Sequence, residues 1–414
     1  MNNLKNEYRS NGNVSKKIVF INLGSFGSTG NIMKTLNKKA TEKGFECFNI
    51  VPVDDSVDYR MNNILLGTKF SRRMSWRMSV ATGLDGCFSV FSTIKAIRKL
   101  KELKPDIIHF HNLHYSYINI PLLINYVKKD NIPVIWTLHD CWSFTGHCPH
   151  FIYEKCDKWK TGCFHCPRYT SYPRSLYDNS KFMWKLKRKW FANINEMVIV
   201  TPSKWLKNQV EQSFLKDYSI KVINNGINLS VFNPSKSDFR TKYNIEAQYI
   251  VLGVANGWGK QKGIDVFVNL AKMLDDSFQI VLVGTNDEID KQLPKNIISI
   301  HRTQNQKELA EIYTAADVFA NPTREDTFPT VNMESLACGT PVITFDTGGS
   351  PEIIDVTCGI VTKEKTAESM AEAIKNVCEN KLFSAENCIE RAKRFGNEKF
   401  IEEYMNLYQE NIKE

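Results

Sequence analysis

The sequence has no apolar run that approaches the length of a membrane-spanning helix; its strongest runs are short stretches such as 17–23 and 279–284. The first 17 residues, MNNLKNEYRSNGNVSKK, also lack the apolar core of a signal peptide. These two absences predict a cytosolic protein. In a reducing compartment, the eleven cysteines are expected to be buried thiols or metal ligands before they are expected to form disulfides.

Extremes of composition are absent as well. With 42% hydrophobic and 24% charged residues, the chain is neither disordered nor fibrous, and 414 residues exceed what one core usually organises, so two domains are expected. The formal net charge of +9 favours phosphate-bearing substrates, an anionic membrane surface or nucleic acid. A solvated basic surface explains the same charge, so the charge alone selects none of these.

Short β-branched runs alternate with amphipathic stretches of helical length, a pattern typical of parallel sheets covered by helices. The pattern occurs twice, on either side of an Asn-, Ser-, Pro- and Gly-rich stretch at 223–238 that we interpret as a linker. The expected strands are 18–23, 48–53, 107–110, 134–138 and 198–200, then 249–254, 279–283, 297–300, 318–320 and 342–345. Two doubly wound α/β domains are therefore predicted, with ligands outside the carboxyl ends of the strands, in a cleft between the domains.

Two segments exceed what a minimal sheet needs, and such additions often carry substrate recognition. One is 69–77, with four basic residues; the other is 141–190, with five of the eleven cysteines. The second ends in the basic and aromatic stretch 181–191, KFMWKLKRKWF, whose composition suits an anionic bilayer surface. A helix that packs Trp184 and Trp190 into the first domain is the alternative.

The most informative segment is 321–354, NPTREDTFPTVNMESLACGTPVITFDTGGSPEII. A strand ends near Pro322 and a helix is expected to begin near Thr330, with Asp326 in the loop and Glu334 in the early turns of the helix. A helix start binds phosphate through unpaired N–H groups and its positive dipole. Because carboxylates would repel a phosphate, Asp326 and Glu334 are expected to accept hydrogen bonds from sugar hydroxyls on either side of a diphosphate.

This segment resembles the E-x7-E signature of glycosyltransferase family 4, whose members have the GT-B fold and retain anomeric configuration. The resemblance assigns Glu334 to the donor ribose and Asp326 to the donor sugar, although the family has Glu at the latter position. It also includes Thr327, Phe328, Thr330 and Val331 in the donor site.

The upstream segment 251–271 matches the family's strand, loop and Lys-Gly helix start. Lys262 corresponds to the lysine that contacts the donor phosphates, where an ammonium stabilises the departing diphosphate. Asn256 stands where the family has an arginine, and Lys260 is the candidate to replace it. No Asp-x-Asp pair occurs in the chain, so we expect catalysis without a metal cofactor.

The first half supplies further candidates. Gly27 and Gly30, in a G-x-x-G-x-x-G loop that runs into a helix, are expected to let phosphates approach the backbone. His111 corresponds to the family histidine near the transferred sugar, and His139 and Asp140 to a second corner on the acceptor side. Each histidine could instead be a structural hydrogen-bonding group, which is our interpretation of His109.

The resemblance covers most of the chain and is strongest to capsular and exopolysaccharide glycosyltransferases, including colanic acid biosynthesis enzymes. It implies domains at 1–222 and 239–395, and a final helix within 396–414 that packs on the first domain. It also implies a hexose-type UDP- or GDP-sugar donor, with the base near 301–303, a lipid-linked saccharide acceptor at the inner face of the membrane, and no nucleic-acid partner.

Three alternatives remain open. A GT-B nucleotide-sugar epimerase would share the architecture. A nicotinamide dehydrogenase would use the 24–30 loop with Asp54 or Asp55 on the ribose, but it leaves Asp326 and Glu334 without a role. A zinc-containing nucleic-acid-binding protein would use the cysteines and the charge.

The cysteine-rich segment suggests a structural zinc site. Cys148, Cys156, Cys163 and Cys166 fall within nineteen positions, the last two as a C-x-x-C pair, and the polar loop between them offers little apolar material to fold around. Reduced buried thiols, a disulfide and an iron–sulfur cluster are the alternatives. Residues nearby that could replace a cysteine ligand are Cys141, His147, His150 and His165.

Overall fold

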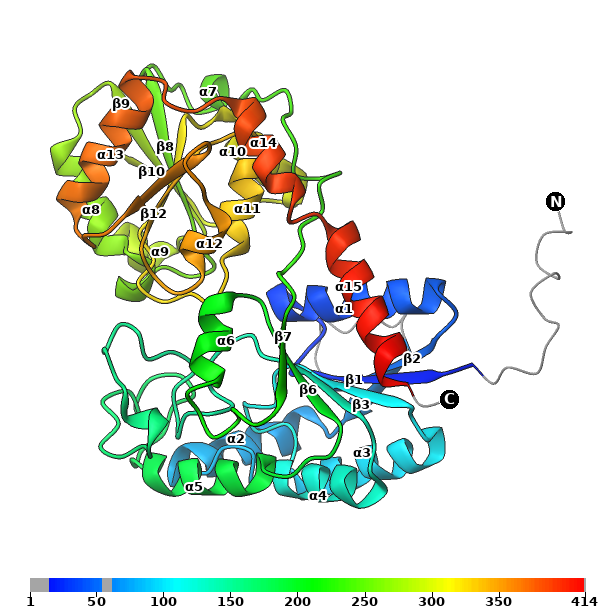
Figure 1. Cartoon of the computed structure of the whole chain (residues 1–414). Helices are drawn as coiled ribbons and strands as arrows, with labels where there is room; N and C mark the ends of the chain where they lie inside the picture. The colour runs from blue at the N-terminus through cyan, green and yellow to red at the C-terminus, as the bar shows by residue number, and fades with distance from the viewer. Residues whose placement is uncertain (1–14, 54–61, 413–414) are drawn as a thin grey trace, which may run out of the picture. The chain divides into compact units, whose positions relative to one another are not determined.

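The computed structural model describes residues 15–53 and 62–412, and two parallel sheets organise them (Figure 1). The first has the strand order β3-β2-β1-β4-β5-β6-β7 and the second β10-β9-β8-β11-β12-β13. Both orders wind outwards in two directions from the strand that comes first in the chain, as in Rossmann folds. The predicted α/β class with two Rossmann-like sheets is confirmed.

The elements of the first half are β1 (Lys17–Ile21), α1 (Gly27–Glu42), β2 (Glu46–Pro52), β3 (Asn63–Leu66), α2 (Lys69–Thr82), α3 (Val90–Leu103), β4 (Ile107–Phe110), α4 (Ile120–Asp130), β5 (Val134–Thr137), α5 (Ser180–Phe191), β6 (Met197–Thr201), α6 (Lys204–Val210) and β7 (Ser219–Val222). Those of the second are α7 (Phe239–Lys242), β8 (Tyr249–Val254), α8 (Ile264–Met273), β9 (Phe278–Val283), α9 (Asp287–Asp290), β10 (Ile297–Ile300), α10 (Gln306–Ala315), β11 (Val318–Asn321), α11 (Thr330–Ala337), β12 (Val342–Phe345), α12 (Ser350–Ile353), β13 (Gly359–Thr362), α13 (Ala367–Glu379), α14 (Ala385–Lys393) and α15 (Asn397–Asn411).

Three strands were not anticipated: β3, β7 and β13. Each has four residues and lies at an edge of its sheet. An edge strand pairs on one side only and needs a weaker apolar pattern than a central strand. The Ser-Ile-Lys-Val sequence of β7, for example, has no fully buried residue.

The second sheet is covered on both faces, and the strand residues alternate between two cores. Val251, Leu282 and Ile343 face one core together with α8 and α13. Leu252 and Val281 face the other, with α10, α11 and α14. Both helix layers are visible beside the sheet in Figure 1. This two-sided burial explains why these strands appear in the sequence as nearly continuous apolar runs.

The chain forms two compact units, and their boundaries differ from the boundary between the two sheets. One unit contains Met1–Thr137, Asn193–Val198 and Met405–Glu414, and the other contains Leu138–Ala192 and Ile199–Tyr404. The cysteine-rich segment, expected in the first domain, therefore packs within the second unit. Within the stretch expected to be a linker, Ile227 and Phe232 are buried in a core of that unit.

The end of the chain belongs to the first unit. Tyr408 of α15 lies with its hydroxyl 2.8 Å from Nδ1 of His109, on β4. No helix in the described part of the chain is long and apolar enough to cross a membrane.

Candidate active site

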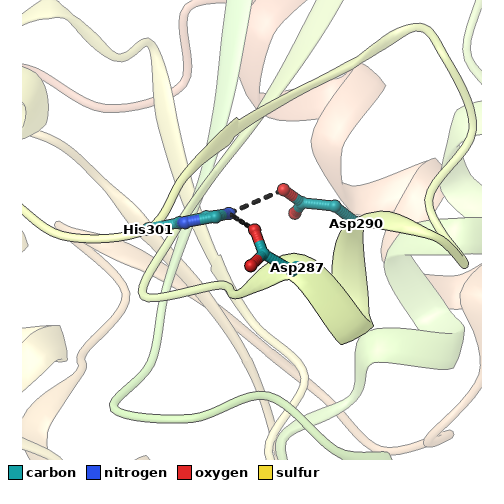
Figure 2. A group of neighbouring side chains, drawn as sticks. All are labelled: Asp287, Asp290 and His301. Atoms are coloured by element: carbon teal, nitrogen blue, oxygen red, sulfur yellow. Dashed lines mark hydrogen bonds and ion pairs between the residues drawn. The ribbon is translucent and has the colours of Figure 1, made fainter.

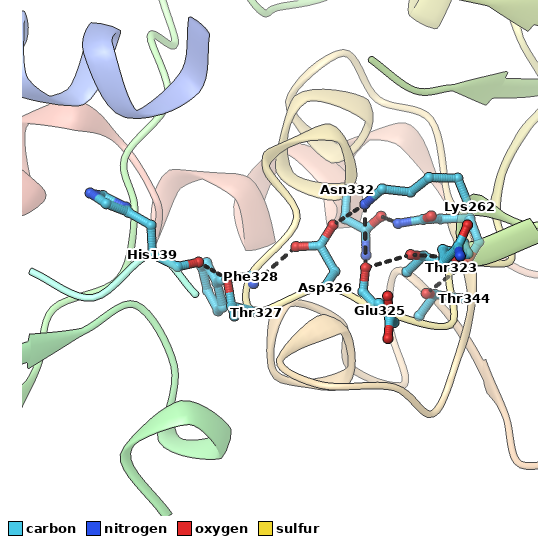
Figure 3. A network of polar contacts seen from close by, with 11 residues as sticks. His139, Lys262, Thr323, Glu325, Asp326, Thr327, Phe328, Asn332 and Thr344 are labelled. Carbon is cyan, nitrogen blue, oxygen red and sulfur yellow. Dashed lines mark hydrogen bonds and ion pairs between the residues drawn. The ribbon is translucent and has the colours of Figure 1, made fainter. Parts of the chain in front are cut away.

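In the second unit, the loops that follow β8, β11 and β12 gather at the carboxyl edge of the sheet. Lys262, in a single 3₁₀ turn at Lys260–Lys262, lies with Nζ 2.7 Å from Oδ2 of Asp326 (Figure 3). Nζ also lies 3.4 Å from the carbonyl oxygen of Glu325. Both side chains remain partly exposed, so the ion pair can be reached by a ligand.

Glycine lets the loops after β8 and β11 approach so closely. Gly263 has φ +79°, and a Cβ there would lie 2.5 Å from the carbonyl oxygen of Pro322. A side chain at this position would therefore strain the backbone and push the two loops apart. A second tie is the ion pair of Arg324 with Asp265, in which two N–O distances are 2.8 Å. Neither partner of this pair was predicted from the sequence, because they lie 59 positions apart in the chain.

The loop after β12 supports Asp326 from the other side. A Cβ on Gly348 would lie 1.8 Å from the carbonyl oxygen of Asp326, and one on Gly349 would lie 2.1 Å from that of Thr327. Only glycine fits where two backbones are in contact. The Gly-Gly pair of the 321–354 motif therefore positions the Asp326 loop and need not touch a ligand.

The helix α11 begins directly after this loop. Pro329 occupies the N-cap position and supplies no side-chain hydrogen bond, so no side chain caps the first turn, which contains Thr330 and Val331. The amide groups at a helix start have no partner inside the helix. Phe328 is buried against Phe395, with ring centroids 5.8 Å apart, and fixes the direction in which the helix start points. These features make the start of α11 a candidate anion site.

Glu334 lies one turn into α11 and is only partly exposed. Desolvation raises its pKa to about 7, although hydroxyl groups of Thr330 and Tyr313 donate hydrogen bonds that favour the ionised form. The Tyr313 hydroxyl lies 3.3 Å from Oε2 of Glu334, and burial raises the pKa of Tyr313 well above its usual range. Near neutral pH, Glu334 therefore exchanges between a carboxylic acid and a carboxylate.

His139 reaches this site through its backbone. Its carbonyl oxygen accepts a hydrogen bond of 2.8 Å from the Thr327 hydroxyl, and its ring points away from Thr327 (Figure 3). Asp140 accepts a hydrogen bond of 2.8 Å from the Trp142 amide. The structure thus brings His139, Thr327 and Asp326 into one loop cluster.

Glu325 is a residue that the sequence analysis missed. Its buried carboxylate forms an ion pair with Arg168 of the cysteine-rich segment and accepts a 3.3 Å hydrogen bond from the Tyr153 amide. A buried charge is tolerated only when it is paired. The pair therefore anchors the cysteine-rich segment to the residue next to Asp326. The only indication in the sequence was that Glu325 is an acidic residue directly before Asp326.

The first unit contains its own group of candidate residues. Gly27 has φ +69° and begins α1, and a Cβ on Gly30 would lie 2.5 Å from the backbone carbon of Ser25, so Gly30 allows a close approach of helix and loop. Asn22 connects this loop to the end of β4, since its side chain bonds the Gly24 carbonyl and the Asn112 amide.

His111 is buried beside that connection, and its ring stacks on His109 at 4.2 Å between centroids. Both ring nitrogens of His109 lie 2.8 Å from hydroxyls, those of Tyr408 and Thr137. This pairing agrees with a structural role for His109. The first unit thus places Gly27, Gly30 and His111 at the carboxyl edge of its sheet.

A third polar group lies after β9 and β10 (Figure 2). Nε2 of His301 is 2.7 Å from Oδ2 of Asp290 and 3.8 Å from Oδ1 of Asp287. Among the described residues, this is the one group of three side chains with potential metal-ligand atoms within 4.8 Å of one another. The hydrogen bond that His301 donates to the Asp290 carboxylate raises the pKa of His301, which favours an imidazolium, and an imidazolium cannot ligate a metal.

The four cysteines expected to bind zinc lie in one segment but do not form such a group of three. The thiol of Cys148 donates to the sulfur of Cys166, which lowers the pKa of Cys166 to about 7. The Gly146 amide lies 3.1 Å from the sulfur of Cys163. All eleven cysteines are free thiols in the structure. Tetrahedral zinc would require the thiol side chains to rotate toward one another.

The expectation that this segment has little apolar material was wrong. Phe144, Phe151 and Trp159 are buried and in ring contact, with centroids 4.8 to 5.1 Å from the Trp159 ring. Trp184 of α5 is also buried, and its Nε1 donates a 2.9 Å hydrogen bond to the Trp159 carbonyl. The segment therefore has an aromatic core of its own.

The interpretation of 181–191 as a bilayer-facing helix is also corrected. Trp184 and Trp190 are buried, and Lys187 is buried as well. The Lys187 ammonium donates to the Trp142 carbonyl at 2.7 Å and lies 3.4 Å from the Trp142 ring centroid. The aromatic residues of α5 thus pack inwards, as the alternative predicted, but the helix belongs to the second unit.

Two family models match the chain: Glycosyltransferase Family 4 at residues 72–231 and Glycosyl transferases group 1 at residues 235–395. The glycosyl transferase WcaC of Escherichia coli K12, whose name assigns it provisionally to colanic acid biosynthesis, is 24% identical over 74% of this chain and 76% of its own. A Campylobacter jejuni N,N'-diacetylbacillosaminyl-diphospho-undecaprenol alpha-1,3-N-acetylgalactosaminyltransferase is 30% identical over 48% of this chain and 56% of its own.

Solved structures agree on the fold. Sucrose-phosphate synthase from Thermosynechococcus elongatus has a TM-score of 0.71 at 17% identity and covers 95% of this chain and 98% of its own. Anabaena HepE, solved with UDP-glucose, has a TM-score of 0.66 at 12% identity and covers 95% and 99%. The protein is a glycosyltransferase of the GT-B type. It carries a Glycosyltransferase Family 4 domain followed by a Glycosyl transferases group 1 domain, and the motif at 321–354 lies in the second of these.

The raised pKa of Glu334 leads to a test of stability. Its folded-state pKa of about 7 lies above the ordinary value of 4.5, so folding becomes less favourable as pH rises from 4.5 through 7. Glu334→Gln keeps an acceptor for Thr330 and Tyr313 but cannot ionise. We expect it to raise the thermal midpoint at pH 8 by about 2 °C or more, and to leave it unchanged at pH 4.5. The exposed Glu368→Gln is the control, and equal shifts at both pH values would contradict the pKa.

Zinc binding by the cysteine-rich segment stays a prediction. Elemental analysis of the purified protein should find about one zinc per chain. Cys163→Ser with Cys166→Ser should lose it, whereas Cys87→Ser, outside the segment, should keep it. A folded, active and zinc-free preparation would leave the cysteines as buried thiols.

Proposed function

We propose that this protein transfers a hexose-type sugar from a UDP- or GDP-sugar to a lipid-linked saccharide acceptor during surface polysaccharide synthesis, with retention of anomeric configuration. The observation that carries the proposal is the 2.7 Å contact of Lys262 with Asp326 beside the uncapped start of α11. A cation, a sugar-type carboxylate and an anion-binding helix start thus lie together.

Lys262 and the start of α11 suit the donor diphosphate. When the bond between the sugar and the diphosphate breaks, negative charge builds on the departing phosphate oxygen. A fixed ammonium and helix amides stabilise that charge without having to reorganise. Retention follows from the family resemblance, with attack by the acceptor hydroxyl on the face that the diphosphate leaves.

The carboxylates suit the two sugars of the donor. Asp326 accepts a 3.2 Å hydrogen bond from the Phe328 amide through one oxygen and contacts Lys262 through the other. In the proposed site, this second oxygen would also accept from a hydroxyl of the transferred sugar. Glu334, deeper in α11, would accept the ribose hydroxyls. Because the ionised form of Glu334 is the better acceptor, donor binding by the free enzyme should strengthen as pH rises through about 7.

The relatives guide the choice of substrates. WcaC is named for colanic acid biosynthesis, and the Campylobacter enzyme is named for an acceptor on diphospho-undecaprenol. HepE was solved with UDP-glucose. These names support a nucleotide-sugar donor and a lipid-diphosphate acceptor, which would place the protein in the cytoplasm, at the inner face of the membrane.

The site variants test this assignment. Lys262→Ala and Asp326→Asn should each lower turnover with saturating donor by about 100-fold or more, because each removes a group that acts on developing charge or on the sugar. Lys272→Ala, at the exposed end of α8, is the matched control. Near-normal turnover in both site variants, with the fold intact, would show that the donor site lies elsewhere. Release of an altered sugar without any acceptor would favour the epimerase alternative.

Metal independence is tested separately. Since Lys262 and the helix amides supply the positive charge, transfer should persist after a short incubation in excess EDTA. The assay measures product with and without added Mg²⁺ or Mn²⁺, while circular dichroism follows the fold. Activity that disappears with EDTA and returns with either ion, at constant fold, would contradict this part of the proposal.

A further inference from the structure

Helix α2, in the first unit, turns its apolar residues outwards. Its two buried residues are Ser75 and Ser79, and the neighbouring Trp76 and Val80 are half-buried. Phe70, Met74 and Met78 follow one another at four-residue spacing and are 75%, 40% and 45% exposed. On a helix this spacing forms one stripe. A surface helix normally has the opposite arrangement, which indicates that the stripe meets something apolar.

A basic cavity lies beside this stripe. Its volume is about 590 Å³, and residues of α2 form most of its wall. The lining residues are Val53, Lys69, Arg72, Arg73, Trp76, Arg77 and Tyr115. Four of the seven are cations and none is an acid, so the cavity suits an anion. We call it the α2 cavity.

The lining residue Tyr115 lies in a backbone segment with an uncommon conformation. Tyr115 and Ser116 have φ of +74° and +59°, a region that residues other than glycine seldom adopt. The buried carboxylate of Asp85 holds both: it accepts from the Tyr115 amide at 3.1 Å, and its other oxygen lies 2.8 Å from the Ser116 hydroxyl. The Tyr115 ring is thereby placed 5.8 Å from the Arg72 guanidinium. Strained backbone that a buried charge maintains is typical of a binding site.

The start of α3 extends the apolar surface. Ser71 of α2 and Ser92 of α3 both lie with their hydroxyls 2.8 Å from where a Cβ on Gly67 would be, so the first turns of the two helices meet there. Phe91, next to Ser92, is 89% exposed. Phe70 and Phe91 therefore belong to neighbouring helix starts, on the same side of the first sheet in Figure 1.

We propose that the α2 cavity binds the diphosphate of the lipid-linked acceptor, while Phe70, Met74 and Met78 lie against the lipid that carries it. This inference rests on the proposed function. Arginine forks bind phosphate oxygens in pairs, and the aromatic rings of Trp76 and Tyr115 provide an apolar wall at the start of the lipid chain. A soluble sugar phosphate would use the cations but not the stripe, and an anionic bilayer alone would not need a cavity beside the stripe.

The experiment measures sedimentation of the full chain with vesicles. The three compositions are phosphatidylcholine alone, phosphatidylcholine with undecaprenyl diphosphate, and phosphatidylcholine with phosphatidylglycerol at equal charge. We expect binding to the diphosphate vesicles at least about tenfold tighter than to the phosphatidylglycerol vesicles, and inorganic pyrophosphate should compete. Arg73→Gln with Arg77→Gln should weaken diphosphate binding by about 10- to 30-fold. Phe70→Ser with Met74→Ser should weaken vesicle binding but not pyrophosphate binding.

The helix α5 supplies matched controls, because Lys181, Lys185 and Phe182 are exposed there. Lys181→Gln with Lys185→Gln, and Phe182→Ser, should bind as the unaltered protein does. The proposal would be overturned if the protein bound both kinds of charged vesicle equally or bound no vesicles. It would also be overturned if the α5 variants lost as much vesicle binding as the α2 variants. If the protein binds pyrophosphate but Phe70→Ser with Met74→Ser leaves vesicle binding unchanged, the ligand is a soluble phosphate compound and the lipid part of the proposal is wrong.

Thermal protection by UDP- and GDP-sugars is measured on the same preparations. The arginine variants could keep thermal protection by nucleotide sugars and also keep unaltered lipid binding. That result would contradict this inference but not the proposed function. If no nucleotide sugar protects the unaltered protein and no transfer is detected, the proposed function fails, whatever the vesicles show.

Discussion

Direct contact between backbones at the carboxyl edge of the second sheet holds the candidate donor site together. Gly263 rests on Pro322, and Gly348 rests on Asp326, at distances that no side chain permits. These contacts, with the Arg324–Asp265 pair, bring Lys262 within 2.7 Å of Asp326 and leave the start of α11 beside them. Lysine and aspartate would otherwise be two charges on separate loops, each screened by water.

The cysteine-rich segment extends this constraint. Its Arg168 pairs with the buried Glu325, one residue from Asp326, and the Thr327 hydroxyl donates to the backbone of His139. A segment that is an addition to the Rossmann scaffold thus supports the donor loop. Its own aromatic core, together with Lys187 over Trp142, keeps that support rigid. A change in this segment would therefore be expected to alter the donor loop.

The proposals assign basic residues of the protein to two binding sites. In the proposed function, Lys262 would act with the start of α11 on the donor diphosphate, whereas the four cations of the α2 cavity would hold the acceptor diphosphate. The apolar stripe on α2 separates the second use from a general basic surface. Because Trp184 and Trp190 of α5 are buried whereas the apolar stripe of α2 is exposed, α2 replaces α5 as the candidate membrane contact.

The sequence by itself determined the two parallel sheets and their central strands, because two-sided burial leaves continuous apolar runs, and the 321–354 motif located Asp326 and Glu334 because their spacing is local. The edge strands β3, β7 and β13 were missed because a four-residue strand that pairs on one side only carries a weak apolar pattern, whereas the edge strand β10 was predicted at 297–300. Only the tertiary structure decided the partners of Glu325 and Arg324, the inward packing of α5 and the cavity beside α2. These depend on contacts between residues far apart in the chain, and on which face of a helix meets the protein.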